Sequence, residues 1–223
     1  MAASRKVVVA KSPDAVTKQS DDVFPASADL PSRAIARLQR IIEELRHVTM
    51  PEPKVLETRI KEVSPAGTVR GNGHLIKLGW PGDIPAIYRI STSTDVCKKL
   101  WSAALSVASQ RKLKAQAAKK SKKEYKPPYK MARLIDYQPG RTCLYVGKTD
   151  EFTSRMREHF SPLSKSTYAM HMSLWAPVGL HNQRISIEYW PLASLNLSDP
   201  VIQALEDTMW EESNPVFGKQ GPK

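Results

Sequence analysis

The stretch from residue 143 to residue 160, CLYVGKTDEFTSRMREHF, constrains the fold more than any other part of the sequence. It begins with apolar, strand-favouring residues, passes Gly147, and continues as a polar helical pattern for which Asp150 is the expected N-cap. A strand that leads directly into a helix is a building unit of α/β folds. The stretch therefore predicts a strand, a tight turn and a helix in immediate succession.

Two other segments have strand patterns. Residues 84–91, IPAIYRIS, form a short apolar run around Pro85, and residues 184–190, RISIEYW, alternate apolar and polar side chains. Helices are predicted between them over 96–113 and after them from Asp199, which we expect to be the N-cap with Pro200 at the first helical position. The sequence predicts an α/β domain with a small three-stranded mixed or antiparallel sheet flanked by helices.

The first 83 residues add an N-terminal region to this domain. Residues 1–30 are polar and contain prolines, which predicts a flexible arm. Residues 32–48 have apolar side chains at helical spacing, with Ser32 as the expected N-cap. This helix is expected to cover the core, with self-association in a homodimer as the alternative. Residues 51–83 are rich in Pro and Gly and predict an irregular connection, with a hairpin turn at 72–73. The predicted division is thus 1–30, 31–83 and 84–223.

Charge is the strongest signal in the composition. The chain has 34 Lys and Arg against 22 Asp and Glu, a formal net charge of +12. A chain this basic is attracted to polyanions, of which nucleic acid is the commonest. The charge is concentrated in residues 111–130, a helix end and loop in which Tyr125 and Tyr129 are interleaved with lysines. We expect this part to follow a phosphate backbone, and a solvated helix face is the alternative. The lysines expected to contact nucleic acid are Lys119, Lys120, Lys122, Lys123 and Lys126.

Other classes of protein are disfavoured by what the sequence contains. No apolar run approaches the roughly 18 to 20 residues that cross a bilayer, and VVVA near the start is too short for a signal-peptide core. Two cysteines, Cys97 and Cys143, make neither a disulfide framework nor a four-ligand metal site, which suits a reducing compartment. The histidines lack zinc-ligand spacing, and there is no phosphate-loop or dinucleotide motif. We therefore expect a cytoplasmic protein.

One group of residues resembles the GIY-YIG nuclease superfamily. The sequence YVGK at 145–148, followed by Arg155 and then by His159 one helical turn later, matches the second motif of that family. The first motif would be Ala86-Ile87-Tyr88, within PAIYRI. The last helix, with Glu206 before the sequence NPVFG, is similar to the closing element of the family.

The resemblance implies a Mg²⁺- or Mn²⁺-dependent endonuclease that hydrolyses double-stranded DNA. Tyr88 would be the general base, and Tyr145 would orient the attacking water or the phosphate. Lys148 would lower the pKa of a neighbouring phenol, and Arg155 would bind the phosphate.

The other two residues complete this implied site. His159 would transfer a proton or bond the phosphate, and Glu206 would be the metal ligand. By analogy with restriction enzymes of this family, a role in restriction or phage defence is expected.

The sequence departs from the family pattern in two places. The family normally has a short connection between its two tyrosine motifs, whereas here residues 91–136 would be an insertion of a helix and a basic loop. Tyr137 is a rival for the first tyrosine, but its surroundings lack a strand pattern, so Tyr88 is preferred. Gly218 stands where the family has asparagine. This second departure supports an alternative function, a catalytically inactive nucleic-acid-binding module with the same fold. A basic structural protein bound to RNA is a third possibility, for which no recognition motif is visible.

Overall fold

The computed structural model describes residues 29–63, 75–76, 79–161 and 167–218. The predicted flexible arm, apart from its last two residues, and the predicted turn at 72–73 lie outside these ranges. The chain divides into two compact units, Met1–Arg40 and Ile41–Lys223. The second unit contains the sheet and the core.

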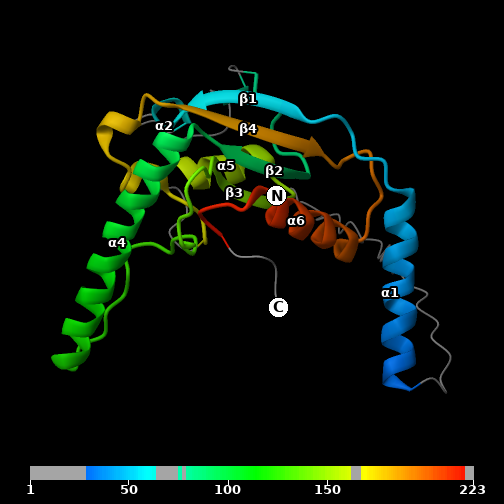
Figure 1. Ribbon diagram of the computed structural model, residues 1–223, viewed down its shortest axis with the longest axis horizontal. Helices are drawn as coiled ribbons and strands as arrows, with labels where there is room; N and C mark the ends of the chain where they lie inside the picture. The colour runs from blue at the N-terminus through cyan, green and yellow to red at the C-terminus, as the bar shows by residue number, and fades with distance from the viewer. Residues whose placement is uncertain (1–28, 64–74, 77–78, 162–166, 219–223) are drawn as a thin grey trace, which may run out of the picture. The chain divides into compact units, whose positions relative to one another are not determined.

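The sheet has four antiparallel strands in the order β1-β4-β2-β3 (Figure 1). The strands are β1 (Lys54–Arg59), β2 (Ala86–Ser91), β3 (Cys143–Thr149) and β4 (Arg184–Pro191). The three predicted strands are confirmed, and the α/β class with them. The prediction of three strands is wrong because β1 lies in the region expected to be irregular.

Strand β1 gives little signal in the sequence because few of its side chains are buried. It pairs with β4 over its whole length, from Lys54 opposite Tyr189 to Arg59 opposite Arg184. Only Thr58 of its six residues is buried, and Val55 is 57% exposed. Without one consistently apolar face, the strand shows no period-two pattern.

Strand β2 is the most buried strand. It lies between β4 and β3, and Ala86, Ile87, Tyr88 and Ile90 are all enclosed. Because successive side chains point to opposite faces, burial of both Ile87 and Tyr88 shows that both faces of β2 are covered. The core there includes Leu100, Leu144, Phe152 and Phe160.

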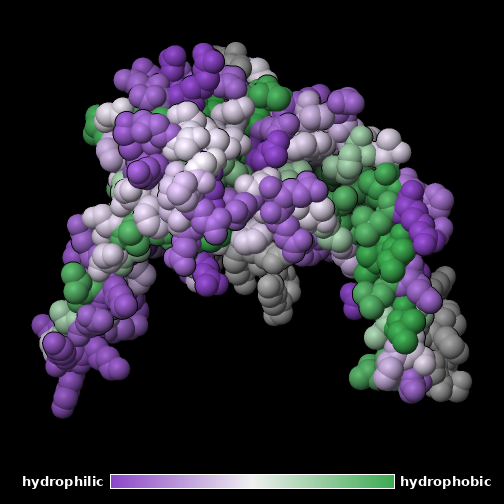
Figure 2. Space-filling view, viewed as in Figure 1, coloured by the Kyte–Doolittle hydropathy of each residue, from purple (hydrophilic) through white to green (hydrophobic). Residues whose placement is uncertain are grey.

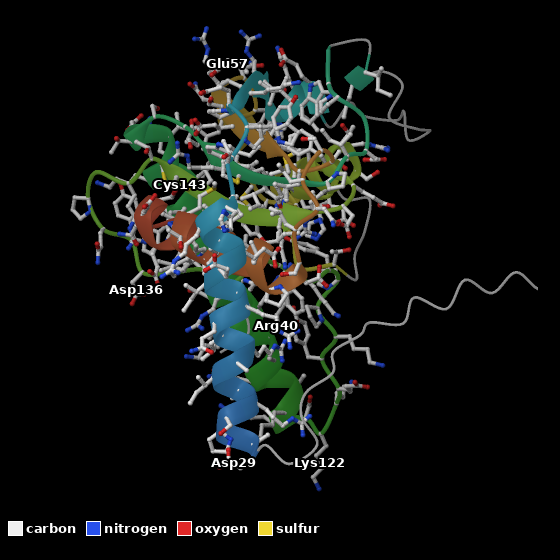
Figure 3. The ribbon with its side chains drawn as sticks, turned by 90° about the vertical axis from the view of Figure 1, so that its right-hand side faces the viewer. Asp29, Arg40, Glu57, Lys122, Asp136 and Cys143 are labelled. Atoms are coloured by element: carbon white, nitrogen blue, oxygen red, sulfur yellow. The ribbon has the colours of Figure 1, made fainter. Side chains whose placement is uncertain are left out.

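The segment between β2 and β3 contains α4 (Thr94–Lys120), which is longer than the predicted 96–113. Ser93 caps this helix by accepting a hydrogen bond from the Val96 N–H at 3.4 Å. All of its buried residues fall between Val96 and Ala104. The remainder extends away from the sheet (Figure 1), and Lys122 lies just beyond its far end (Figure 3).

Two helices carry candidate site residues, and the N-cap of each is one residue away from the predicted one. Helix α5 (Phe152–Phe160) has Glu151, not Asp150, at its N-cap, without a side-chain capping bond. Helix α6 (Asp199–Ser213) has Ser198, not Asp199, at its N-cap, and Pro200 in its first turn as predicted. The shorter elements are α2 (Ile60–Val63) and the 3₁₀ turns η1 (Met172–Leu174) and η2 (Val178–Leu180).

The N-terminal helix α1 (Leu30–His47) has no buried residue. Asp29, rather than Ser32, caps it, since an Asp29 carboxylate oxygen accepts the Ser32 N–H at 2.8 Å. Ile35, Leu38 and Ile42 are at least half exposed, and Figure 2 shows apolar side chains along this helix. Whether the helix covers the core, as expected from the sequence, stays a prediction. None of the described helices is long and apolar enough to cross a membrane.

Candidate active site

The register between β2 and β3 brings two tyrosines to the same face of the sheet. Tyr88 lies directly opposite Gly147, so both point to one face. Tyr145 precedes Gly147 by two residues and therefore points to that face as well. The rings of Tyr88 and Tyr145 are nearly parallel, with centroids 6.1 Å apart and an angle of 14° between their planes.

Gly147 is required for this arrangement of the two rings. A Cβ atom at this position would lie 2.7 Å from the Tyr88 hydroxyl oxygen and 2.8 Å from a ring carbon of Tyr145. Both distances are shorter than any real Cβ contact, and the neighbours are packed rings rather than flexible chain ends. The glycine of the YVGK sequence thus provides the space into which the tyrosines fit.

Helix α5 adds two nitrogen donors to the Tyr88 hydroxyl. His159 Nε2 lies 2.9 Å from the hydroxyl oxygen, and Arg155 Nε donates to it at 3.3 Å. The His159 ring also contacts Tyr145, with ring centroids 4.4 Å apart. Arg155 and His159 are one helical turn apart and therefore reach the tyrosines from the same face of α5.

The tautomer of His159 follows from its second contact. The backbone N–H of Met170 donates to His159 Nδ1 at 3.3 Å, so Nδ1 carries no proton. Burial lowers the pKa of His159 well below its ordinary value, and the charges on Arg155 and His171 lower it further. The ring is neutral, and its proton is on Nε2, which donates to Tyr88. The Tyr88 oxygen consequently accepts two N–H bonds.

Arg155 is fixed in place by the protein on three sides. Besides the bond to Tyr88, it forms an ion pair with Glu158 at 2.6 Å, and its second terminal nitrogen donates to the Tyr168 carbonyl at 2.9 Å. The Thr167 hydroxyl in turn donates to Glu158 at 2.9 Å. A guanidinium has five N–H donors, and this network uses three of them. Its side chain is 17% exposed, so a phosphate can reach it.

The two tyrosines differ in accessibility. Tyr88 is entirely enclosed, whereas Tyr145 is half-buried. Burial raises the pKa of both phenols above the ordinary value, and the positive charge of Arg155 opposes that rise in each case. Of the two tyrosines, Tyr145 is thus the one with solvent-exposed atoms.

Glu206 reaches the same site from α6. Burial raises the pKa of its carboxyl, the charge of Lys148 opposes this rise, and the neighbouring Asp207 adds to it. Gln203 donates to its carboxylate at 3.1 Å. Glu206 also contributes to the raised pKa of Tyr88 and Tyr145, which places its carboxylate near both phenols.

The surroundings of Glu206 fit a single Mg²⁺. A partly desolvated carboxylate gains from a nearby cation, and Mg²⁺ is commonly held by one or two carboxylates with several waters. The described part of the chain has no cluster of three or more His, Cys, Asp or Glu side chains able to hold a metal ion.

The cation acting on the phenols differs from the one expected. Lys148 was expected to lower the pKa of a neighbouring phenol, but the positive charge that acts on Tyr88 and Tyr145 belongs to Arg155. The charge of Lys148 acts on Glu206. The reason is the alternation along β3, which directs Tyr145 and Lys148 to opposite faces of the strand.

The remaining predicted residues lie away from this cluster. Tyr137 packs against Trp101, with ring centroids 5.5 Å apart, and so does not replace Tyr88 beside Tyr145. Gly218 contacts the site only by its closeness to the Tyr145 ring. The five lysines proposed for nucleic-acid contact are all exposed beyond the buried part of α4, and Lys126 forms an ion pair with Glu124 at 3.4 Å.

Three groups in and around the site have no counterpart in the sequence interpretation. Glu158 orients Arg155, the Met170 N–H sets the tautomer of His159, and Trp210 lies beside Gly218. The position of Glu158, three residues after Arg155, was a usable signal for an ion pair on one helix. Bonds from the backbone near residues 168–170 depend on tertiary structure, and nothing in the sequence indicates them.

No protein-family model, curated protein or solved structure matched this chain in the comparisons.

Proposed function

We propose that the protein is a Mg²⁺-dependent endonuclease of the GIY-YIG type that hydrolyses DNA phosphodiester bonds. The observation that carries the proposal is the convergence of Tyr88, Tyr145, Arg155 and His159 on one another, with Glu206 beside the phenols. Each group has a use in phosphodiester hydrolysis, and they come from three separate parts of the chain. Mn²⁺ would serve in place of Mg²⁺.

The geometry favours Tyr145, rather than Tyr88, as the residue that accepts a proton from the attacking water. Tyr145 is the accessible phenol, and Arg155 stabilises its ionised form. Tyr88, with donors from His159 and Arg155, fixes the Arg155 guanidinium against Tyr145. His159 is neutral and enclosed, so its role is to orient Tyr88 and not to exchange protons with solvent.

The reaction is an in-line displacement at phosphorus. The step begins with Tyr145 as a phenolate beside Arg155. The water oxygen forms a bond to phosphorus as the bond to the 3′ oxygen breaks, the proton of the water goes to the phenolate oxygen of Tyr145, and the 3′ oxygen takes a proton from solvent. Arg155 binds the phosphate oxygens on which charge increases. Glu206 would hold Mg²⁺, which supplies positive charge for the phosphate and the leaving oxygen. The products carry a 5′ phosphate and a 3′ hydroxyl.

Double-stranded DNA is the proposed substrate because of the charge distribution. The net charge is +12, and the far half of α4 and the loop after it carry exposed lysines. The end of α4 is largely hydrophilic in Figure 2. Phosphate contacts of this kind supply affinity without reading sequence. A cytoplasmic location, a homodimer and a role in restriction or phage defence belong to the same proposal.

A catalytically inactive nucleic-acid-binding module remains the second candidate. Two observations favour it: Gly218 lacks the expected amide side chain, and burial raises the pKa of both phenols. Such a module would bind DNA through the same lysines and would cut nothing.

Cleavage of supercoiled plasmid and linear DNA in Mg²⁺ or Mn²⁺ distinguishes the two candidates. We expect wild-type protein to cut, and Glu206→Gln and Arg155→Lys each to lower the rate constant by about 10²-fold or more, because each removes charge or geometry needed in the transition state. Glu212→Gln, an exposed glutamate on the same helix, is the matched control and should keep full activity. Tyr145→Phe should be inactive, whereas Tyr88→Phe should retain measurable cleavage.

Binding must be measured beside cleavage. In Ca²⁺, Glu206→Gln should bind DNA as tightly as wild type, because the lysines of α4 are unchanged. Binding by the wild type with no cleavage under either divalent ion would support the inactive module and contradict the nuclease.

A further inference from the structure

The indole N–H of Trp210 is buried without a hydrogen-bond acceptor among the described residues. The corresponding donors of two other tryptophans are satisfied: Trp101 donates to the Ile135 carbonyl at 2.7 Å and Trp175 to the Met170 carbonyl at 2.6 Å. Tryptophan can only donate, and a buried donor without an acceptor is unfavourable and uncommon. The position of this donor therefore requires an explanation.

Trp210 lies in the candidate active site. It follows Glu206 by one turn of α6, which places the two side chains on the same side of the helix. Its Nε1 is 3.8 Å from the point where a Cβ on Gly218 would be, and that point is 3.3 Å from the Tyr145 ring. The unpaired donor is thus adjacent to the accessible phenol and to the proposed metal ligand.

The backbone at Gly218 keeps a side chain out of this place. Its φ angle is +107°, a conformation that side-chain-bearing residues rarely adopt. The Gly218 N–H donates to the Arg133 carbonyl at 2.8 Å, and Leu134 forms a bridge with Phe217, so the segment is held in this conformation. The amide side chain expected from the family resemblance cannot stand here without strain, and Trp210 Nε1 lies next to the space that it would fill.

We propose that the Trp210 indole N–H donates a hydrogen bond to a non-bridging oxygen of the scissile phosphate, in place of a side chain at position 218. The inference rests on the proposed nuclease function and adds one substrate-contacting residue to it. A phosphate oxygen is an anionic acceptor, and it would satisfy the donor that the free protein leaves unpaired. The Trp210 ring is partly exposed although its nitrogen is not, so a change of side-chain torsion brings the N–H to the substrate.

The test removes this donor and little else. Benzothienylalanine, introduced at position 210 by codon suppression, replaces the indole N–H with sulfur at nearly constant shape. We expect kcat for DNA cleavage to fall about 10- to 100-fold with KM changed less than about twofold, because a donor used in the transition state has been lost. The melting temperature should be unchanged, since no bond of the free protein is removed. The same replacement at Trp101 is the matched control and should lower the melting temperature while leaving kcat intact.

The outcomes separate the two proposals. Wild-type cleavage with unchanged kcat in the position-210 variant would overturn the role of Trp210 and leave the nuclease function standing. A fall in melting temperature as large as that at position 101 would also overturn it, because the N–H would then be a structural donor, for example to the face of the Tyr145 ring. Absence of cleavage by the wild type would instead contradict the nuclease function itself.

Discussion

Because the ring of His159 is buried and neutral, the stability of the folded protein depends on pH through this residue. Its Nδ1 accepts from the Met170 backbone, and its Nε2 donates to Tyr88. A second proton would have to displace the Met170 N–H and would place a charge beside Arg155. Both effects oppose protonation, in agreement with the lowered pKa of this histidine.

This arrangement predicts a loss of stability in acid. In the unfolded chain a histidine binds a proton near pH 6.5, whereas folded His159 binds one only at much lower pH. As pH falls below about 6.5, the unfolded state is therefore favoured by up to about 1.4 kcal/mol per pH unit from this residue. Above that pH the residue is neutral in both states and its contribution is constant.

The measurement compares the free energy of unfolding of wild type and His159→Gln between pH 7.5 and 5. Glutamine has no titration in this range but can still donate to Tyr88. The variant should show a shallower decline with acid than the wild type. Equal declines would show that His159 titrates normally and is not held neutral.

Individual residues of the site were predictable where their spacing is local. Tyr145, Arg155 and His159 are recognisable from one short stretch, because strand alternation and the helical turn fix how they face one another. The exchange of roles between Lys148 and Arg155 was not predictable, since it depends on which face of the sheet α5 covers. Nor was the donor of Trp210, because its contact with Gly218 depends on how the chain turns after α6.

At the scale of elements, the expected DNA-binding lysines lie on α4 and on the loop that leads from it to β3, residues 121–142, called the return loop below. The return loop is attached to the helix, since the Arg111 guanidinium lies 4.0 Å from the centre of the Tyr129 ring and donates to the Tyr129 carbonyl. These contacts join the loop to the helix. The lysine-bearing end of α4 and the return loop are together called the supported arm below. Clustered cations on a supported arm lose less conformational freedom on binding than cations on a free chain.

Replacing Lys119, Lys120, Lys122 and Lys123 by Gln should weaken DNA binding and reduce its dependence on salt. Each lost phosphate contact lowers the slope of log K against log salt concentration by about 0.9, so the slope should fall by up to about 3 to 4. Fluorescence anisotropy of labelled duplex DNA at several salt concentrations gives both quantities. Cleavage should persist at low salt, because the site itself is unchanged.

The control variant loses the same number of positive charges from another part of the surface. Lys54, Lys61, Lys98 and Lys99 are exposed residues outside the proposed DNA-contacting part of α4 and its loop. Their replacement by Gln should change the slope much less. A slope unchanged by the first set, or changed equally by both sets, would indicate that the arm is only a solvated helix.

Whether a segment forms a helix or a strand was largely predictable, but the first and last residues of each element were less so. Strands β2, β3 and β4 have apolar patterns because each faces the core, and all three were found from sequence. Strand β1 was missed because most of its side chains are exposed, so its residues show no apolar alternation, and its pairing with β4 relies on backbone hydrogen bonds that any sequence can make. The three predicted N-caps were displaced by one to three residues, since neighbouring polar residues such as Ser198 and Asp199 are both acceptable caps.

For the molecule as a whole, the exposed apolar face of α1 predicts self-association. Ile35, Leu38 and Ile42 recur at steps of three and four and are 55%, 58% and 50% exposed. A second copy of the same helix would cover this face by pairing through a seam of the coiled-coil type. Light scattering at tens of micromolar protein should report the mass of two chains.

Leu38→Lys should convert the dimer to a monomer, because a charge in the centre of an apolar seam is costly. Leu113→Lys is the matched control: this leucine is 65% exposed on α4 and lies outside the proposed seam. It should leave the mass unchanged. A monomeric wild type over the whole concentration range would contradict the dimer.

The pairing of β2 with β3 has a consequence for the rate of folding. These strands hold the two tyrosines, yet the chain between them runs from residue 92 to residue 142. Closing a loop costs about 0.6 kcal/mol more for each doubling of its length, and contacts between distant residues slow folding. Helix α4 offsets part of this cost, because a helix forms from local contacts and its returning loop brings the two strand ends together. The speed at which β2 and β3 pair should therefore depend on how readily α4 becomes helical.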